Sequence, residues 1–185
     1  MNINLLDNAE AKLLQQLIIE AEHIVICAHK SPDGDALGSS LAWKSYLNQI
    51  GKTDVTVCMP DAYPDFLQWL PEANTVLRYD KNPEKVQETF NRADLVCCLD
   101  FNQYARVEAM RSTLEGCKAK RILIDHHLEP QTDNAITISQ PNMSSTSEMI
   151  FYIISQLGGY NDMTKDCAQC IYCGMMTDTG GFTYN

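Results

Sequence analysis

The sequence predicts an α/β fold with a doubly wound, mostly parallel sheet of five or six strands and helices on both faces. Short apolar runs alternate along the chain with segments of helical periodicity, which is typical of βαβ units. After their first residue, the runs at 94–99 and 121–124 are continuously apolar, as expected of strands covered on both faces. Acidic and imidazole residues follow three of the runs, and right-handed connections are expected to bring them to one edge of the sheet.

The first half of the chain is expected to contain three strands separated by helices. The expected elements are a helix over 8–20, a strand over 23–28, a helix over 35–50 ending at Gly51, a strand over 54–58, a short helix at 65–70, a weak strand over 75–77 and a helix over 83–91. Prolines 60, 64 and 71 make 59–71 a connection.

The second half continues the alternation within the same single domain, which we expect to cover residues 1–185. Its expected elements are a strand over 94–99, a helix over 104–114, strands over 121–124 and 135–138, a helix from 145 to 157 that stops at Gly158-Gly159, and a last helix over 163–177. Ser145 and Glu148 have the spacing of a capping box at the start of the penultimate helix.

Composition and charge narrow the class of partner. The chain has 185 residues and a formal net charge of −10, which argues against long duplex nucleic acid because phosphate binding needs a basic surface. No apolar run approaches the length of a membrane span or a signal peptide, so the protein is expected in the cytoplasm and away from membranes. The eight cysteines lie mostly in apolar runs and are interpreted as reduced, buried side chains.

The turn after the first strand carries one imidazole and two carboxylates. His29, Asp33 and Asp35 lie within seven residues, and Pro32 and Gly34 shape the turn. Taken alone, Asp35 also suits a helix cap. Together, the three side chains form a ligand set that a divalent cation accepts.

Further candidate ligands follow later strands and the last helix. They are Asp100, Asp125, His126, His127 and Asp178. Each has an ordinary interpretation when taken alone: a loop residue, a solvated pair, a residue in a glycine turn. Four carboxylates in one pocket repel each other unless cations neutralise them, so two ions roughly 3.5–4 Å apart with one bridging Asp are the simplest arrangement. Mixed His and carboxylate ligands favour Mn²⁺ or Co²⁺ over Mg²⁺.

Four segments resemble, in order, the motifs of the DHH phosphoesterase family, a RecJ-like family. The segments are His29 to Ser39, Leu99-Asp100, Ile124-Asp125-His126-His127 and Thr177-Asp178-Thr179-Gly180. The Pro-Asp-Gly-Asp-Ala-Leu-Gly-Ser form is similar to the bacterial nanoRNase and pAp phosphatase branch, where pAp is 3′-phosphoadenosine 5′-phosphate. It is less similar to family II pyrophosphatases, which share the metal motifs.

The resemblance implies two metal positions that share one ligand. His29 and Asp33 are expected at one ion, and Asp100 is expected to bridge it to the second. The second ion is expected to bind Asp35, His126 and Asp178. Two divalent ions, Mn²⁺ first with Co²⁺ or Mg²⁺ as alternatives, are the implied cofactors.

The resemblance also implies roles around the metals. Asp125 is expected to orient a neighbouring side chain by a hydrogen bond. His127 is expected to face the substrate, to polarise the phosphoryl group or to act as acid for the leaving oxygen. The implied nucleophile is a metal-bridging hydroxide rather than a side chain.

Two residues are candidates for binding the substrate. Arg106 lies one helical turn beyond the site and suits a phosphate contact, and its alternative is a structural ion pair or an exposed helix residue. Ser39, like Ser40, lies early in the helix after the first turn and is a candidate phosphate donor, with inert helix packing as its alternative.

The spacing of Cys167, Cys170 and Cys173 is similar to that of an iron–sulfur motif. No fourth cysteine follows, and the spacing of three places all three on one helix face. The sequence therefore favours buried helix packing at these positions.

The expected activity is hydrolysis of short oligoribonucleotides, of pAp, or of both. Related phosphodiesterases carry a C-terminal substrate-binding domain with a glycine-rich, His-containing motif, and no segment here resembles it. We therefore expect the chain to be the metal-binding catalytic domain without that domain. The alternatives are a phosphodiesterase for cyclic or linear dinucleotides such as c-di-AMP, a pyrophosphatase, and a nucleotide-binding module that is inert alone. A homodimer is among the open oligomeric states.

Overall fold

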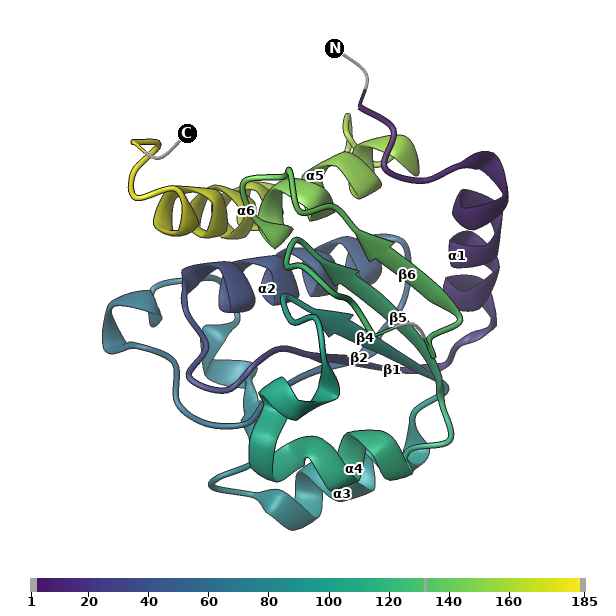
Figure 1. The fold of residues 1–185 in the computed structure, drawn as a ribbon, viewed down its shortest axis with the longest axis vertical. Coiled ribbons are helices and arrows are strands. Elements are labelled where there is room, and N and C mark those ends of the chain that lie inside the picture. The colour runs from purple at the N-terminus through teal and green to yellow at the C-terminus, as the bar shows by residue number, and fades with distance from the viewer. Residues whose placement is uncertain (1–2, 132, 184–185) are drawn as a thin grey trace.

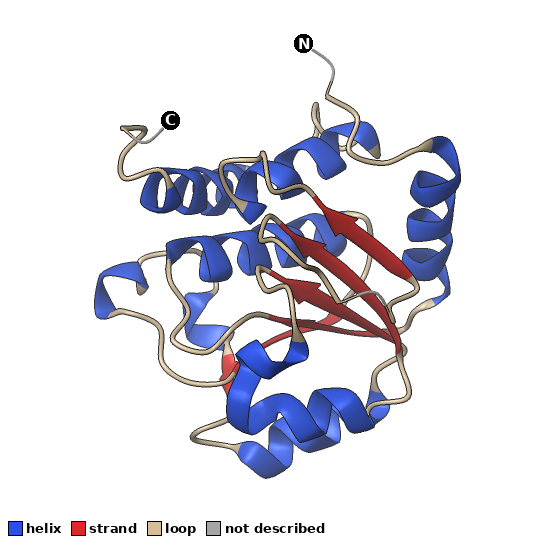
Figure 2. Ribbon diagram, viewed as in Figure 1, coloured by secondary structure: helices blue, strands red, loops and turns tan. Residues whose placement is uncertain are grey.

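The computed structural model describes residues 3–131 and 133–183, and its centre is a six-stranded sheet (Figures 1 and 2). The strands are β1 (His23–Cys27), β2 (Asp54–Met59), β3 (Leu77–Arg78), β4 (Leu95–Leu99), β5 (Lys120–Asp125) and β6 (Ile136–Ser139). Their order is β3-β2-β1-β4-β5-β6, and every neighbouring pair is parallel. The predicted fold class is confirmed.

Helices cover both faces of the sheet (Figure 1). They are α1 (Asn8–Glu20), α2 (Gly34–Gln49), α3 (Pro83–Arg92), α4 (Arg111–Gly116), α5 (Thr146–Gln156) and α6 (Lys165–Asp178), with 3₁₀ helices η1 (Asp65–Leu67), η2 (Ala73–Thr75) and η3 (Tyr104–Met110). Helices α2, α5 and α6 lie on one face, and α3 and α4 lie on the other. No helix in the described residues is both long and apolar enough to cross a bilayer.

Alternate side chains of the strands pack into two separate apolar cores. In β1, Ile24 and Ile26 face the core beneath α2, α5 and α6, while Val25 and Cys27 face the core against α3 and α4. All eight cysteines are free and buried, as predicted. The three cysteines of α6 pack into the first core, and no group of metal-ligand atoms in the described residues includes a cysteine.

Helices α2 and α6 approach each other closely because small residues face each other across the contact. A Cβ atom built on Gly38 would lie 2.6 Å from the backbone oxygen of Cys170, and one built on Gly174 would lie 2.8 Å from the Asp35 carboxylate. Neither space can hold a methyl group without movement of the backbone or of the carboxylate. This contact brings the end of α6 to the beginning of α2.

Three local predictions need correction. The helix expected over 104–114 is broken, because Glu108, inside the segment Tyr104–Met110, adopts the non-helical angles φ 39° and ψ −110°. The third strand lies at Leu77–Arg78, later than predicted. The capping box at α5 is incomplete: the Ser145 hydroxyl accepts from the Glu148 N–H, but the Glu148 carboxylate accepts from Ser144 instead.

Candidate metal centre

Six predicted ligands gather at the carboxyl edge of the sheet, where β1 and β4 lie side by side and the strand order reverses. Such a reversal leaves a crevice in which α/β proteins bind ligands. Figure 1 shows the ends of the strands, the beginning of α2 and the end of α6 on this side of the molecule. Strand ends supply His29, Asp100 and His126, and helices supply Asp33, Asp35 and Asp178.

The first group of ligand atoms comes from His29, Asp33 and Asp100. The Nε2 atom of His29 lies 3.8 Å from Oδ2 of Asp33 and 3.4 Å from Oδ2 of Asp100. His29 and Asp100 are buried, whereas Asp33 is exposed. The Nδ1 atom of His29 is 2.8 Å from the Lys30 carbonyl oxygen, which fixes the ring so that Nε2 faces the carboxylates.

The second group comes from Asp35, His126 and Asp178. The Nε2 atom of His126 lies 3.5 Å from Oδ2 of Asp178 and 3.7 Å from Oδ1 of Asp100. Its Nδ1 atom lies 3.2 Å from the Met143 carbonyl oxygen, so this ring is oriented in the same way as that of His29. Asp100 therefore presents one oxygen to each group.

The two groups fit a pair of divalent cations. Separations of 3.4–3.8 Å between Nε2 and carboxylate oxygens are long for hydrogen bonds but suit two ligand atoms that each lie about 2.1 Å from one ion. Burial raises the pKa of Asp35 to about 6 and holds the pKa of Asp100 well above its usual range. Buried carboxylates that repel each other need positive charge between them.

Local structure explains how α2 presents its two aspartates. The Asp33 carboxylate caps α2 by accepting from the N–H groups of Asp35 and Ala36, each at 3.0 Å. The capping role considered for Asp35 was thus wrong for α2. Both Asp35 oxygens instead accept from the first two N–H groups of α5, those of Thr146 and Ser147, at 2.6 and 2.8 Å.

The backbone at Asp100 is also unusual. Its φ of 62° is in the left-handed region, which aspartate tolerates better than most residues. Its N–H still donates to the Ile124 carbonyl at 3.1 Å, so the residue is tied to β5 while the chain turns away from β4. Strained backbone of this kind is often found at functional sites, and here it directs a buried carboxylate between the two ligand groups.

The Asp125–His127 pair lies beside the second group. The Oδ1 atom of the fully buried Asp125 is 2.7 Å from Nδ1 of His127, and its Oδ2 accepts from the His127 N–H at 3.0 Å. The hydrogen bond to Asp125 raises the pKa of His127. Because Asp125 occupies Nδ1, the half-exposed ring offers Nε2 to a molecule in the crevice.

The two predicted substrate contacts, Arg106 and Ser39, differ in their exposure to solvent. Arg106 is exposed and lines a cavity of about 360 Å³ together with His29, Lys30, Ser31, Ala105 and Glu108. Within the described residues its guanidinium pairs with no carboxylate, so it remains a candidate for phosphate binding. The side chain of Ser39 is fully buried within α2, and its hydroxyl lies 3.4 Å from the Ala36 carbonyl. This position supports packing and gives no access to a substrate.

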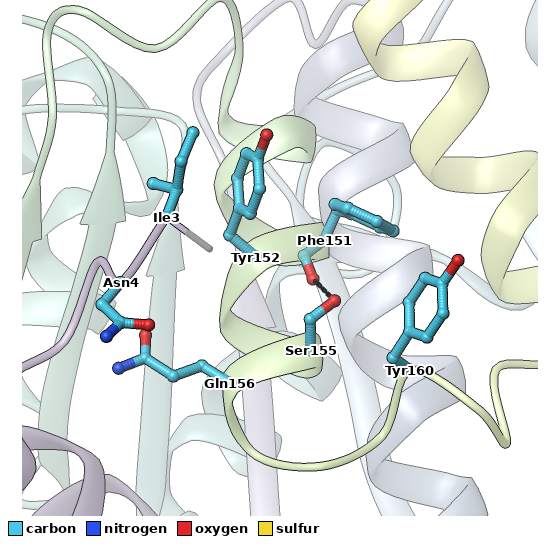
Figure 3. A pocket seen from close by; sticks show the side chains of 7 residues that line it. All are labelled: Ile3, Asn4, Phe151, Tyr152, Ser155, Gln156 and Tyr160. Carbon is cyan, nitrogen blue, oxygen red and sulfur yellow. Dashed lines mark hydrogen bonds between the residues drawn. The ribbon is translucent and has the colours of Figure 1, made fainter. Parts of the chain in front are cut away.

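A larger cavity, of about 510 Å³, lies at the other end of α5 (Figure 3). Its walls include the rings of Phe151, Tyr152 and Tyr160. The amide of Gln156 is already engaged with the backbone of Leu5 and Leu6, and the Ser155 hydroxyl donates to the Phe151 carbonyl. None of the candidate ligands lines this cavity. The larger of the two cavities is therefore not the one beside the candidate metal centre.

Removal of metal is expected to make stability depend on pH. The folded pKa of Asp35, about 6, exceeds the unfolded value of about 3.9, so the unfolded state binds fewer protons between these pH values. The free energy of unfolding contributed by Asp35 therefore falls as pH rises from 4 to 6, by on the order of 3 kcal/mol. The raised pKa of Asp100 extends this decrease in the free energy of unfolding to higher pH.

Thermal melts between pH 4.5 and 7.5, with EDTA or with Mn²⁺, measure this effect. The stabilisation by Mn²⁺, taken as the difference in Tm between the two series, is expected to grow with pH because the ions bind the ionised carboxylates. A difference that is constant or shrinks with pH would contradict the buried acidic centre.

Comparisons with known proteins identify the family of this chain. The model of the family described as "DHH family, N-terminal domain" matches residues 23–175. Among curated proteins, the bifunctional oligoribonuclease and PAP phosphatase NrnA of Thermus thermophilus is 32% identical over 161 residues, covering 87% of this chain and 44% of that protein. The cyclic-di-AMP phosphodiesterase PdeA of Listeria monocytogenes is 23% identical over 180 residues, covering 94% of this chain and 27% of that protein.

A solved structure is similar over nearly the whole chain. The exopolyphosphatase-related protein of Bacteroides fragilis superposes with a TM-score of 0.93 at 44% sequence identity. The match covers 96% of this chain and 52% of that one. The chain thus spans about half the length of this protein and less than half of the two curated relatives.

Proposed function

The chain belongs to the DHH family, and from this premise we propose that it is the catalytic part of a phosphoesterase that uses two divalent cations to hydrolyse short oligoribonucleotides and pAp. One observation carries the proposal: the two oxygens of Asp100 face two separate groups of His and Asp ligands. That arrangement suits a bridging ligand between paired ions. The similarity to NrnA supports the choice of substrates.

The proposed mechanism divides the work between metals and protein. Divalent cations bound by the two groups would supply a water of lowered pKa and positive charge against the phosphoryl oxygens. The ligand set of imidazoles and carboxylates favours Mn²⁺ or Co²⁺ over Mg²⁺. The side chains of His29 and His126, held at Nδ1 by backbone carbonyls, keep Nε2 directed into the crevice.

The residues beside the two ligand groups would bind and protonate the substrate. His127, held by Asp125, is placed to donate from Nε2 to a phosphoryl oxygen or to the leaving oxygen. The raised pKa of His127 increases the fraction that carries this proton at neutral pH. Arg106, on the wall of the adjoining cavity, offers a charged fork for a second phosphate of a nucleotide substrate.

A second candidate function is hydrolysis of cyclic or linear dinucleotides of the c-di-AMP type. It is favoured by the similarity to PdeA, which extends over 94% of this chain. The proposed metal centre would serve either oligoribonucleotides or dinucleotides of this type, since both contain a phosphodiester, whereas pAp is cleaved at a phosphomonoester. The formal net charge of −10 still predicts that long duplex nucleic acid binds poorly.

The proposal predicts Mn²⁺-dependent turnover of a diribonucleotide and of pAp. We expect the protein with Mn²⁺ to release mononucleotides from the first and phosphate from the second, faster than it cleaves cyclic di-AMP, with EDTA abolishing all three reactions. Chromatography of the products measures each rate. Preferential cleavage of cyclic di-AMP would support the second candidate. Calorimetric binding of pAp without turnover, in Mn²⁺, Co²⁺ and Mg²⁺ alike, would reduce the chain to a nucleotide-binding module.

A further inference from the structure

The beginning of α5 contacts carboxylates from both ligand groups. The N–H groups of Thr146 and Ser147 donate to the two oxygens of Asp35, and the Thr146 hydroxyl donates to Oδ1 of Asp100 at 2.9 Å. Thr146, Asp35 and Asp100 are all at most 2% exposed. These hydrogen bonds connect two consecutive residues at the beginning of α5 to Asp100, the candidate bridging ligand, and to Asp35 of the second group.

The hydrogen bond to Asp100 determines how its carboxylate is turned. Oδ1 accepts from Thr146 and faces His126, while Oδ2 faces His29. Within the described residues, the Thr146 hydroxyl is the only side-chain donor hydrogen-bonded to an Asp100 oxygen. Rotation of the carboxylate away from this donor would remove an oxygen from one ligand group or from both.

Helix capping does not account for the Thr146 hydroxyl. Ser145 is the N-cap of α5, and its hydroxyl accepts from the Glu148 N–H at 3.0 Å. The N–H groups of the first helical turn have no partner within the helix, and here two of them hold Asp35. The helix beginning is therefore complete without any bond from the Thr146 side chain.

We propose that Thr146 is a positioning residue of the metal centre, whose hydroxyl keeps one oxygen of Asp100 directed to each ion. The inference rests on the proposed function, because it assumes that the two groups bind ions. In this arrangement the beginning of α5 orders Asp35 and Asp100 together before any ion binds. Donors that orient metal ligands typically contribute about 10–100-fold to metal affinity.

The test compares three variants by titration calorimetry with Mn²⁺. Thr146→Val removes the hydroxyl at nearly constant shape and is expected to weaken Mn²⁺ binding by about 10–100-fold. Thr146→Ser keeps the hydroxyl and is expected to bind Mn²⁺ nearly as tightly as the native protein. Thr113→Val is the matched control, because Thr113 is a buried threonine of α4 on the opposite face of the sheet.

A spectroscopic measurement adds a readout that is independent of turnover. Two Mn²⁺ ions that share a carboxylate give an exchange-coupled electron paramagnetic resonance spectrum. We expect this signal in the native protein and in Thr146→Ser, and we expect Thr146→Val to show uncoupled Mn²⁺ at the same metal concentration. If Thr146→Val does not fold, Thr146→Ala is used with the same expectations.

The outcomes separate the inference from the function on which it rests. Native protein that binds two ions, together with a Thr146→Val variant of equal affinity and coupling, would overturn the role of Thr146 alone. A Thr113→Val variant as weak as Thr146→Val would overturn it too, because the loss would then reflect packing in general. Native protein that binds no Mn²⁺ would overturn both the inference and the proposed function.

Discussion

Asp100→Asn is expected to reduce phosphoesterase activity by at least about 10³-fold while making the metal-free protein more stable. The amide cannot bridge two cations, so calorimetry should find fewer than two bound Mn²⁺ ions. Asparagine is the better substitution than alanine because it also tolerates the left-handed backbone of residue 100, and it keeps an oxygen for the Thr146 hydroxyl.

The gain in stability follows from the environment of the carboxylate. Burial, followed by repulsion from Asp35, raises the pKa of Asp100 well above the value of an unfolded aspartate, so the ionised carboxylate opposes folding. Removing that charge is expected to contribute roughly 2 kcal/mol, or about 5 °C in Tm, in EDTA. Asp162→Asn, at an exposed aspartate between α5 and α6, is the control. Activity close to native would refute the bridging role, and a lower Tm in EDTA would refute the predicted gain in stability.

Gly38→Ala is expected to have the largest effect on stability. Its Cβ would lie 2.6 Å from the Cys170 backbone oxygen, a contact that a folded chain relieves only by moving α6 away from α2. Overpacking of this kind costs about 1–3 kcal/mol, which corresponds to a decrease of roughly 3–10 °C in Tm. Because Asp178 ends α6, Mn²⁺ affinity should fall as well.

The matched control is Gly116→Ala at the end of α4. Apart from its chain neighbours and the backbone of its own helix, no atom lies within 4 Å of a Cβ built there. The substitution is expected to raise the free energy of unfolding by about 0.4–1 kcal/mol, because alanine lowers the conformational entropy of the unfolded chain. Thermal melts of the two variants in EDTA, followed by Mn²⁺ titration, measure both effects. A Gly38→Ala variant that melts like the native protein would show that the two helices separate easily.

The fold, and the candidate ligands that follow strands, could be predicted from the sequence because both depend on local rules. A buried strand such as 94–99 is visible as an apolar run, and the residue that follows it lies at a sheet edge by topology. His29, Asp100 and His126 could therefore be placed from strand positions alone. Asp178 follows a helix rather than a strand, and its assignment to the second ion came from the resemblance to the DHH family motifs.

Features that depend on contacts between distant segments could not be predicted in this way. The break at Glu108 accompanies a hydrogen bond from the Lys30 N–H to the Arg106 carbonyl, which no local pattern reveals. The Ser-Ser-Thr-Ser-Glu run was recognisable as a helix start, but its contacts with Asp35 and Asp100 cross the fold. The role of Thr146 was missed for this reason.

The spacing of the ligands along the chain has a consequence for the order of events in folding. The first ligand group needs only the ends of β1 and β4 and the turn before α2, but the second joins Asp35 to Asp178 and is incomplete until the last helix has packed against α2 and the sheet. Contacts between such distant segments tend to form late, because closing long loops is entropically costly. Cations bound there would act mainly after the rate-limiting barrier: they would slow unfolding and leave the refolding rate nearly unchanged.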